Sequence, residues 1–166
     1  MTYSEELEEC NIEYDRPLTE KDVTYTCYLI ECVSRLTLHR NKETTSKLGV
    51  GGIYHIMCFI QQYQMLDPRE ASEEIIEDFN LDMGDFVITD ISPQYFTGIP
   101  DEYRMGLKYG ELVLDTKTDN ESYAEAILRV YKNPICGVID DYECNAYEEC
   151  RHNTKIAYEM GYFECQ

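Results

Sequence analysis

Residues Cys136 to His152 contain three cysteines, five acidic residues and one histidine within seventeen positions. Such a stretch could bind a metal ion, hold a nucleophile beside its base, or form an acidic surface over a small core. Structural zinc is usually bound by four Cys or His ligands that include close pairs such as C-x2-C. Cys144, Cys150 and His152 have the spacing C-x5-C-x-H instead, and on one helix the two cysteines would lie on different faces. We therefore expect no metal ion here, and we interpret the cysteines as small apolar residues that point inward.

A second candidate centre is His55 with Cys58, three positions apart in the apolar segment "GGIYHIMCFIQQYQML". On a helix the imidazole and the thiol could touch, as a catalytic cysteine and its base must. The same positions suit a core histidine beside a packed thiol, and a strongly acidic protein disfavours a thiolate. We expect no catalytic residue, but a small enzyme or ligand-binding protein with a pocket near His55 and Cys58 is the alternative function.

Paired carboxylates are frequent, at Glu73/Glu77, Asp140/Asp141 and Glu148/Glu149. Acid–base or metal-assisted chemistry needs such groups in a pocket that shifts their pKa values. Among 33 acidic residues, close pairs arise by chance and usually face solvent. The glycine cluster at 49–52 matches neither G-x-G-x-x-G nor the Walker motif, so no cofactor is expected.

The charge of the chain restricts its partners. It has 14 Lys and Arg against 33 Asp and Glu, a net charge of −19. A surface of this sign repels nucleic acids and anionic membranes and attracts basic proteins. A helix-turn-helix formed around "LDP" is also excluded by charge, because its recognition helix "PREASEEIIEDF" would be strongly acidic.

The N-terminus lacks the basic and apolar regions of a signal peptide, and no apolar run approaches twenty residues. We therefore expect a cytoplasmic protein that does not enter a membrane, with eight reduced cysteines, most of them buried.

Apolar spacing and capping signals predict a mainly helical chain. A capping box at Thr19–Asp22 begins a helix that runs to about Arg40, one more turn reaches Gly49, and the central apolar helix follows. Asp67 and Pro68 begin a helix whose outer side carries Glu73, Glu74, Glu77 and Asp78. Further helices are expected over 100–114, after a cap at Thr118, and as two pieces between Asp140 and Phe163 that divide near Asn153 and stop near Gly161.

The segment Phe86–Ile91 is the best strand candidate, and "ICGVI" at 135–139 is a second one. The predicted fold is a mainly α, single-domain bundle of five to seven helices over residues 19–166, with a minor two-stranded β element at most and α+β as the alternative class. Residues 1–18 are predicted to be an acidic, partly extended lead-in.

We predict that the chain acts as an acidic protein-binding module. In size and charge it is similar to DNA mimics that inhibit restriction or CRISPR enzymes and to acidic antitoxins, although no motif supports a family. The predicted partner is a basic protein, such as a nuclease or another nucleic-acid-binding enzyme, which the chain would inhibit. Alternatives are a homo-oligomeric structural protein, and acidity that only keeps the chain in solution. The predicted partner-binding residues are Glu73, Glu74, Glu77, Asp78, Asp140, Asp141, Glu148, Glu149, Tyr142 and Tyr147.

Overall fold

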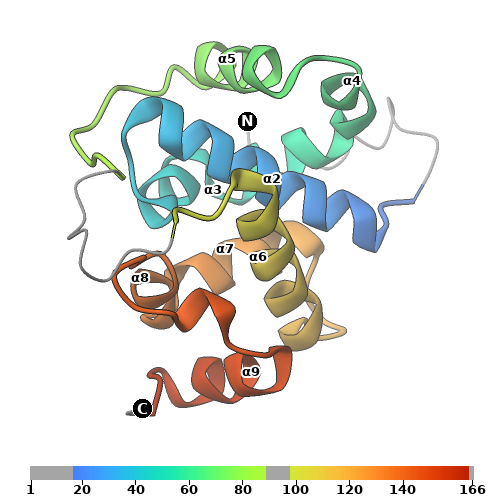
Figure 1. The fold of residues 1–166 in the computed structure, drawn as a ribbon. Coiled ribbons are helices and arrows are strands. Elements are labelled where there is room, and N and C mark those ends of the chain that lie inside the picture. Colours follow the sequence, from blue (N-terminus) through green and yellow to red (C-terminus); the bar gives the residue numbers. More distant parts are fainter. Residues whose placement is uncertain (1–16, 89–97, 165–166) are drawn as a thin grey trace.

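The computed structural model describes residues 17–88 and 98–164 and confirms the mainly helical class. Within these ranges the α-helices are α2 (Glu20–Thr37), α3 (Asn41–Cys58), α4 (Ile60–Gln64), α5 (Pro68–Asp78), α6 (Glu102–Thr116), α7 (Tyr123–Lys132), α8 (Ile135–Ile139) and α9 (Arg151–Met160), with a 3-10 helix at Ala146–Glu148. In Figure 1, α2 crosses the centre, α5 lies above it, and α8 and α9 lie in the lower half.

Capping residues fix the starts of the helices as predicted in two places. The Thr19 backbone N–H donates to the Asp22 carboxylate at 2.8 Å, which completes the capping box of α2. Asp67 caps α5 by accepting from the Arg69 N–H at 2.8 Å, with Pro68 in the first turn. A cap was predicted wrongly at Thr118, because Ser122 and Glu125 form the capping box of α7 instead.

Both strand predictions are wrong where the structure tests them. The run at 135–139 forms the short helix α8, since a five-residue apolar run fits a buried helical turn as well as a strand. Residues 86–88 are not in a strand, and the rest of that candidate lies outside the described residues. The division of the last segment also differs from the prediction: Asn153 lies inside α9, which starts after Cys150, whereas the stop at Gly161 is confirmed by its left-handed φ of 84°.

One connected hydrophobic core includes residues from each of the α-helices given above. Its centre contains Tyr109 of α6 stacked on Tyr131 of α7, with ring centroids 4.4 Å apart. At Gly49 the backbone of α3 leaves helical geometry with φ 66°, so the predicted extra turn and the apolar helix form one kinked element. In the described part of the chain, each helix is too short or too polar to span a bilayer.

Helices α2 and α6 approach closely where α6 has glycines. A Cβ at Gly106 would stand 2.7 Å from the Cα of Tyr28, and one at Gly110 would stand 2.8 Å from the hydroxyl oxygen of Thr24. The absence of side chains at 106 and 110 therefore permits this contact, although glycine lowers helix propensity. The contact holds α6 beside the stretch of α2 that carries Glu31 and Arg35.

Candidate functional site

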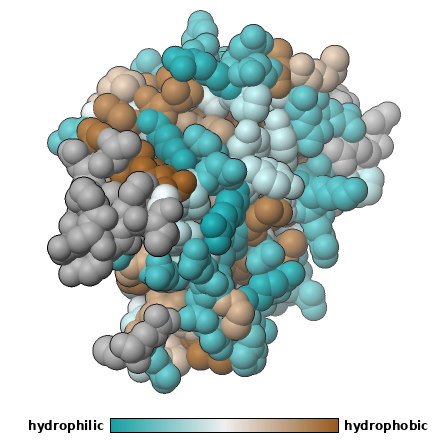
Figure 2. All heavy atoms as spheres, in the orientation of Figure 1, coloured by the Kyte–Doolittle hydropathy of each residue, from teal (hydrophilic) through white to brown (hydrophobic). Residues whose placement is uncertain are grey.

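The first predicted acidic group lies on the outer side of α5. Glu73, Glu74, Glu77 and Asp78 are all exposed, as expected, while the buried side of the helix packs on α2 and α4 through Ala71 and Ile75. Hydrophilic side chains cover the top of the molecule in Figure 2, where α5 lies. The prediction that this helix presents its acids outward is confirmed.

Most carboxylates of α5 form no ion pair with the described residues. Glu73 forms an ion pair with Arg69 at 3.1 Å, but Glu70, Glu74, Glu77 and Asp78 form none with the residues that the structure describes. Their negative potential reaches the neighbouring helix: burial raises the pKa of Tyr63 to about 12, and the charges of Asp78 and Glu74 add to that effect.

The α5 acids are placed where they weaken their own helix. Glu73/Glu77 and Glu74/Asp78 are like-charge pairs at i,i+4, each of which costs about 0.2–0.5 kcal/mol. Glu77 and Asp78 also lie in the last turn, which contains no basic residue, although the helix dipole favours cations there. Helix stability alone therefore does not account for these acids.

The second predicted acidic group, near the C-terminus, is dispersed. Asp141 is exposed, Glu148 is exposed and paired with Arg104 at 3.5 Å, and Glu149 is half-buried. This group is far from the first, because α8 packs on α7 and on the 3-10 helix, away from α5 (Figure 1). The structure therefore does not unite the predicted acids in one face.

Tyr142 and Tyr147, which are among the predicted partner-binding residues, are buried in the structure. They are only 4% and 6% exposed, and their rings pack edge to face with centroids 5.6 Å apart. The Tyr142 hydroxyl donates to Glu31 Oε1 at 3.2 Å, and the Arg104 guanidinium lies over the Tyr147 ring. Buried polar partners satisfy the Tyr142 hydroxyl, which allows the whole side chain to turn inward.

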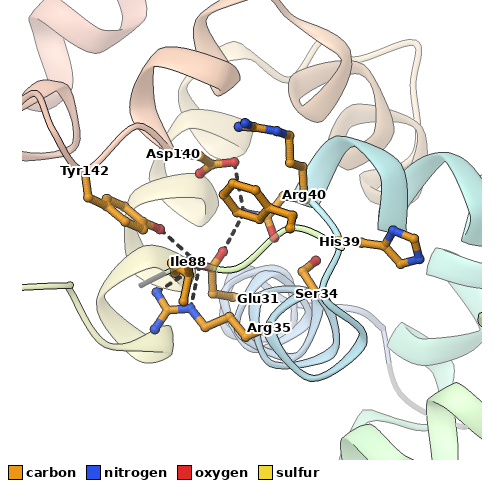
Figure 3. A pocket seen from close by; sticks show the side chains of 10 residues that line it. Glu31, Ser34, Arg35, His39, Arg40, Ile88, Asp140 and Tyr142 are labelled. Carbon is orange, nitrogen blue, oxygen red and sulfur yellow. Dashed lines mark hydrogen bonds and ion pairs between the residues drawn. The ribbon is translucent and has the colours of Figure 1, made fainter. Parts of the chain in front are cut away.

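The sequence analysis expected the Asp140 carboxyl group to face solvent. In the structure this group turns inward from the end of α8. The Asn41 amide nitrogen donates to Asp140 Oδ2 at 3.2 Å and to Glu31 Oε2 at 2.5 Å, so one amide holds two carboxyl groups (Figure 3). Glu31 itself is 2% exposed. We call Glu31, Asn41 and Asp140 the carboxyl bridge.

Further groups complete the environment of the carboxyl bridge. Arg35 forms an ion pair with Glu31 at 3.0 Å, and the Tyr109 hydroxyl donates to Asp140 Oδ1 at 2.6 Å. Burial, and then the nearby negative charge of Glu31, raise the pKa of Asp140 to about 8, and these effects outweigh the hydrogen bonds from Tyr109 and Asn41. The Asp140 carboxyl group is therefore largely protonated at neutral pH.

The carboxyl bridge lines a pocket with Ser34, Arg40, Phe86 and Ile88 (Figure 3). The space open to the centre of a water molecule is only about 20 Å³, enough for one water but not for an organic cofactor. Asn41 Oδ1 is buried there and has no hydrogen-bond partner among the residues that the structure describes. Over the described ranges, no cluster of three or more Cys, His, Asp or Glu side chains is placed to hold a metal ion.

The alternative centre at His55 and Cys58 does not form a described pocket. His55 packs against Phe59 and Phe79, with ring centroids 4.6 and 5.5 Å away, and Cys58 is buried. Neither residue lines any of three pockets in the described part of the chain. These contacts match the core-packing interpretation of the two side chains.

The cysteines of the 136–152 stretch lie in different environments. Cys136 is buried and donates to the Val130 carbonyl at 2.8 Å, Cys144 is half-buried, and Cys150 is exposed at the start of α9. The six cysteines of the described chain are free thiols, and Cys10 and Cys165 lie outside it.

Comparisons of this chain with protein-family models, with curated proteins and with solved structures find no match.

Proposed function

We propose that this protein binds a basic protein partner stoichiometrically and uses the acidic side of α5 as the main contact. The observation that supports this proposal is the set of exposed carboxylates on α5, most of which form no ion pair with the residues that the structure describes. A partner that brings lysines or arginines to the exposed side of α5 supplies positive charges to pair with these carboxylates.

Energetics favour the same interpretation. The like-charge pairs and the acids in the last turn destabilise α5, and a basic partner would relieve both costs on binding. Removing this repulsion contributes to affinity, and the attraction also accelerates encounter at low salt.

The partner class that suits this surface best is a nucleic-acid-processing enzyme. Such enzymes have basic clefts that bind phosphates, and a row of carboxylates competes for the same cleft. The chain would then inhibit its partner as a DNA mimic or as an antitoxin-like protein.

The test uses the full chain with Glu73, Glu74, Glu77 and Asp78 all changed to Lys. Its control changes four exposed acids elsewhere, Asp85, Asp119, Glu159 and Glu164, to Lys, which gives the same net charge. Basic proteins that copurify with the wild-type chain are identified, and their affinity for each chain is measured by calorimetry over a range of salt concentrations.

We expect the α5 variant to lose at least tenfold in affinity and most of its salt dependence, while the control keeps most of both. The α5 variant should remain folded, because all four positions are exposed and the lysines at 77 and 78 suit the last turn of the helix. Equal losses in the two variants, or a chain that only self-associates in sedimentation, would overturn the proposal.

A further inference from the structure

Asn41 holds the Glu31 and Asp140 carboxyl groups together, but of the two only Glu31 forms an ion pair with a described residue. Arg35 pairs with Glu31, but no Lys, Arg or His nitrogen of the described chain lies within 4.0 Å of the Asp140 carboxyl oxygens. Both groups accept from the same Asn41 amide. Two carboxyl groups in one buried site resist double ionisation, so one proton stays with the pair.

The same pair holds a segment of the chain in place. Residues 140–149, between α8 and α9, reach α6 and the start of α3 through Asp140, and they reach α2 through the bond from Tyr142 to Glu31. The polar attachments of Asp140 and Tyr142 therefore end on the carboxyl bridge or on groups bonded to it, whereas Arg104 and Lys108 of α6 hold Glu148 and Glu149 separately.

We propose that the carboxyl bridge is a proton-controlled latch. A proton on Asp140, beside the Glu31 carboxyl group, holds the start of this segment, residues 140–142, against α2, α3 and α6, and loss of this proton frees it. Freeing it would expose the Tyr142 ring, which packs on Tyr147. This inference goes beyond the proposed function, because it uses a different region of the surface from α5.

The other ionisable groups around Asp140 lie on or beside α2, α3, α6, α7 and α8. Arg35 of α2, Arg40 before α3 and Lys42 of α3 are the nearby cations. Burial raises the pKa of Tyr109 on α6, of Tyr131 on α7, of Cys136 on α8 and of Tyr142, so these groups stay neutral.

His39 lines the same pocket but is bound elsewhere. Its ring nitrogens lie 2.7 Å from Glu43 and 2.9 Å from the Asp82 carbonyl. Replacement of Asp140 leaves these contacts of His39 in place, which separates the two groups experimentally.

The direction of the pH effect follows from proton linkage. Because the pKa of Asp140 is about 8 in the closed state and near 4 in an open, solvated segment, the closed state holds the proton more tightly. The latch is fully effective below about pH 4 and weakens as the pH rises through about 8. The opening equilibrium should rise by up to about tenfold per pH unit over this window and then level off.

Hydrogen exchange of peptides that cover residues 138–149, corrected for intrinsic rates, measures this opening from about pH 5 to about pH 9. In the wild-type chain we expect the opening equilibrium to rise and then level near pH 8. Asp140→Asn keeps a carbonyl for the Tyr109 hydroxyl but cannot ionise, so its profile should be flat. The control Asp141→Asn makes the same charge change at the next, exposed position and should keep the wild-type profile.

A second variant covers the case in which Asp140→Asn does not fold. Glu31→Gln removes the neighbouring charge, so the profile should level off at a lower pH than in the wild type. A wild-type profile without pH dependence would overturn the latch, and so would a pH dependence that survives in Asp140→Asn or is unmoved in Glu31→Gln. All of these measurements use the isolated chain, so their failure is separate from that of the proposed function.

Discussion

The ammonium group of Lys108 is a buried cation that joins two helices. It donates to the Thr154 hydroxyl of α9 at 2.7 Å and to the backbone carbonyl of Glu149. Burial lowers the pKa of Lys108, and the carboxylates of Glu111 and Glu149 oppose that effect. A single long side chain thus satisfies acceptors at the start of α9 and fixes this helix on α6.

Replacement of Lys108 by Met should destabilise the protein by about 1–3 kcal/mol, because the Glu149 carbonyl would lose this buried donor. Urea unfolding followed by circular dichroism measures the change. Lys155→Met removes an exposed lysine of the same helix pair and should change the free energy of unfolding by less than about 0.5 kcal/mol. Similar losses in both variants would contradict the role given to Lys108.

For single residues, the sequence predicted which side chains are exposed better than it predicted which side chains contact one another. The α5 acids follow from helical spacing, since apolar Ala71 and Ile75 mark the opposite side. The carboxyl bridge joins residues 10 and 99 positions apart, and spacing carries no information about such contacts. One signal was present: Glu31 follows Cys27 by four positions on the apolar stripe of α2, where a charged residue needs a buried partner.

Among the elements, the contact between α2 and α6 depends on the glycines of α6. We predict that Gly106→Ala destabilises the protein by about 1–3 kcal/mol, because its methyl group would meet the Tyr28 backbone. Gly137→Ala in α8 is the matched control, since no atom lies within 4 Å of its added Cβ. The control should be neutral or stabilising by up to about 1 kcal/mol. Thermal unfolding of both variants tests this, and a neutral Gly106→Ala would refute the packing argument.

Helix starts were predictable because their signals are local. The capping box at Thr19 and the Asp67-Pro68 start depend on three or four adjacent residues, and both occur as expected. The strand prediction for residues 135–139 was wrong because distant residues decide the secondary structure of this segment. These include the core residues that pack around Ile135 and Ile139. The role of the α6 glycines could not be predicted for the same reason, since helix propensity does not show that another helix packs against them.

For the molecule as a whole, the net charge of −19 implies self-repulsion that salt screens. We predict that the free energy of unfolding rises as sodium chloride is increased from about 0.02 M to about 0.2 M. The rise should be smaller in the α5 lysine variant, because each substitution of an acid by Lys makes the net charge two units less negative. Urea unfolding at each salt concentration measures both, and a salt-independent wild-type chain would show that its charges are balanced locally.

The close approach of α2 and α6 also has an evolutionary consequence. A Cβ at position 106 would meet the backbone of Tyr28, whereas one at position 110 would first meet the hydroxyl oxygen of Thr24. In relatives of this chain, position 106 should therefore remain glycine, whereas a larger residue at 110 should be accompanied by a smaller one at 24.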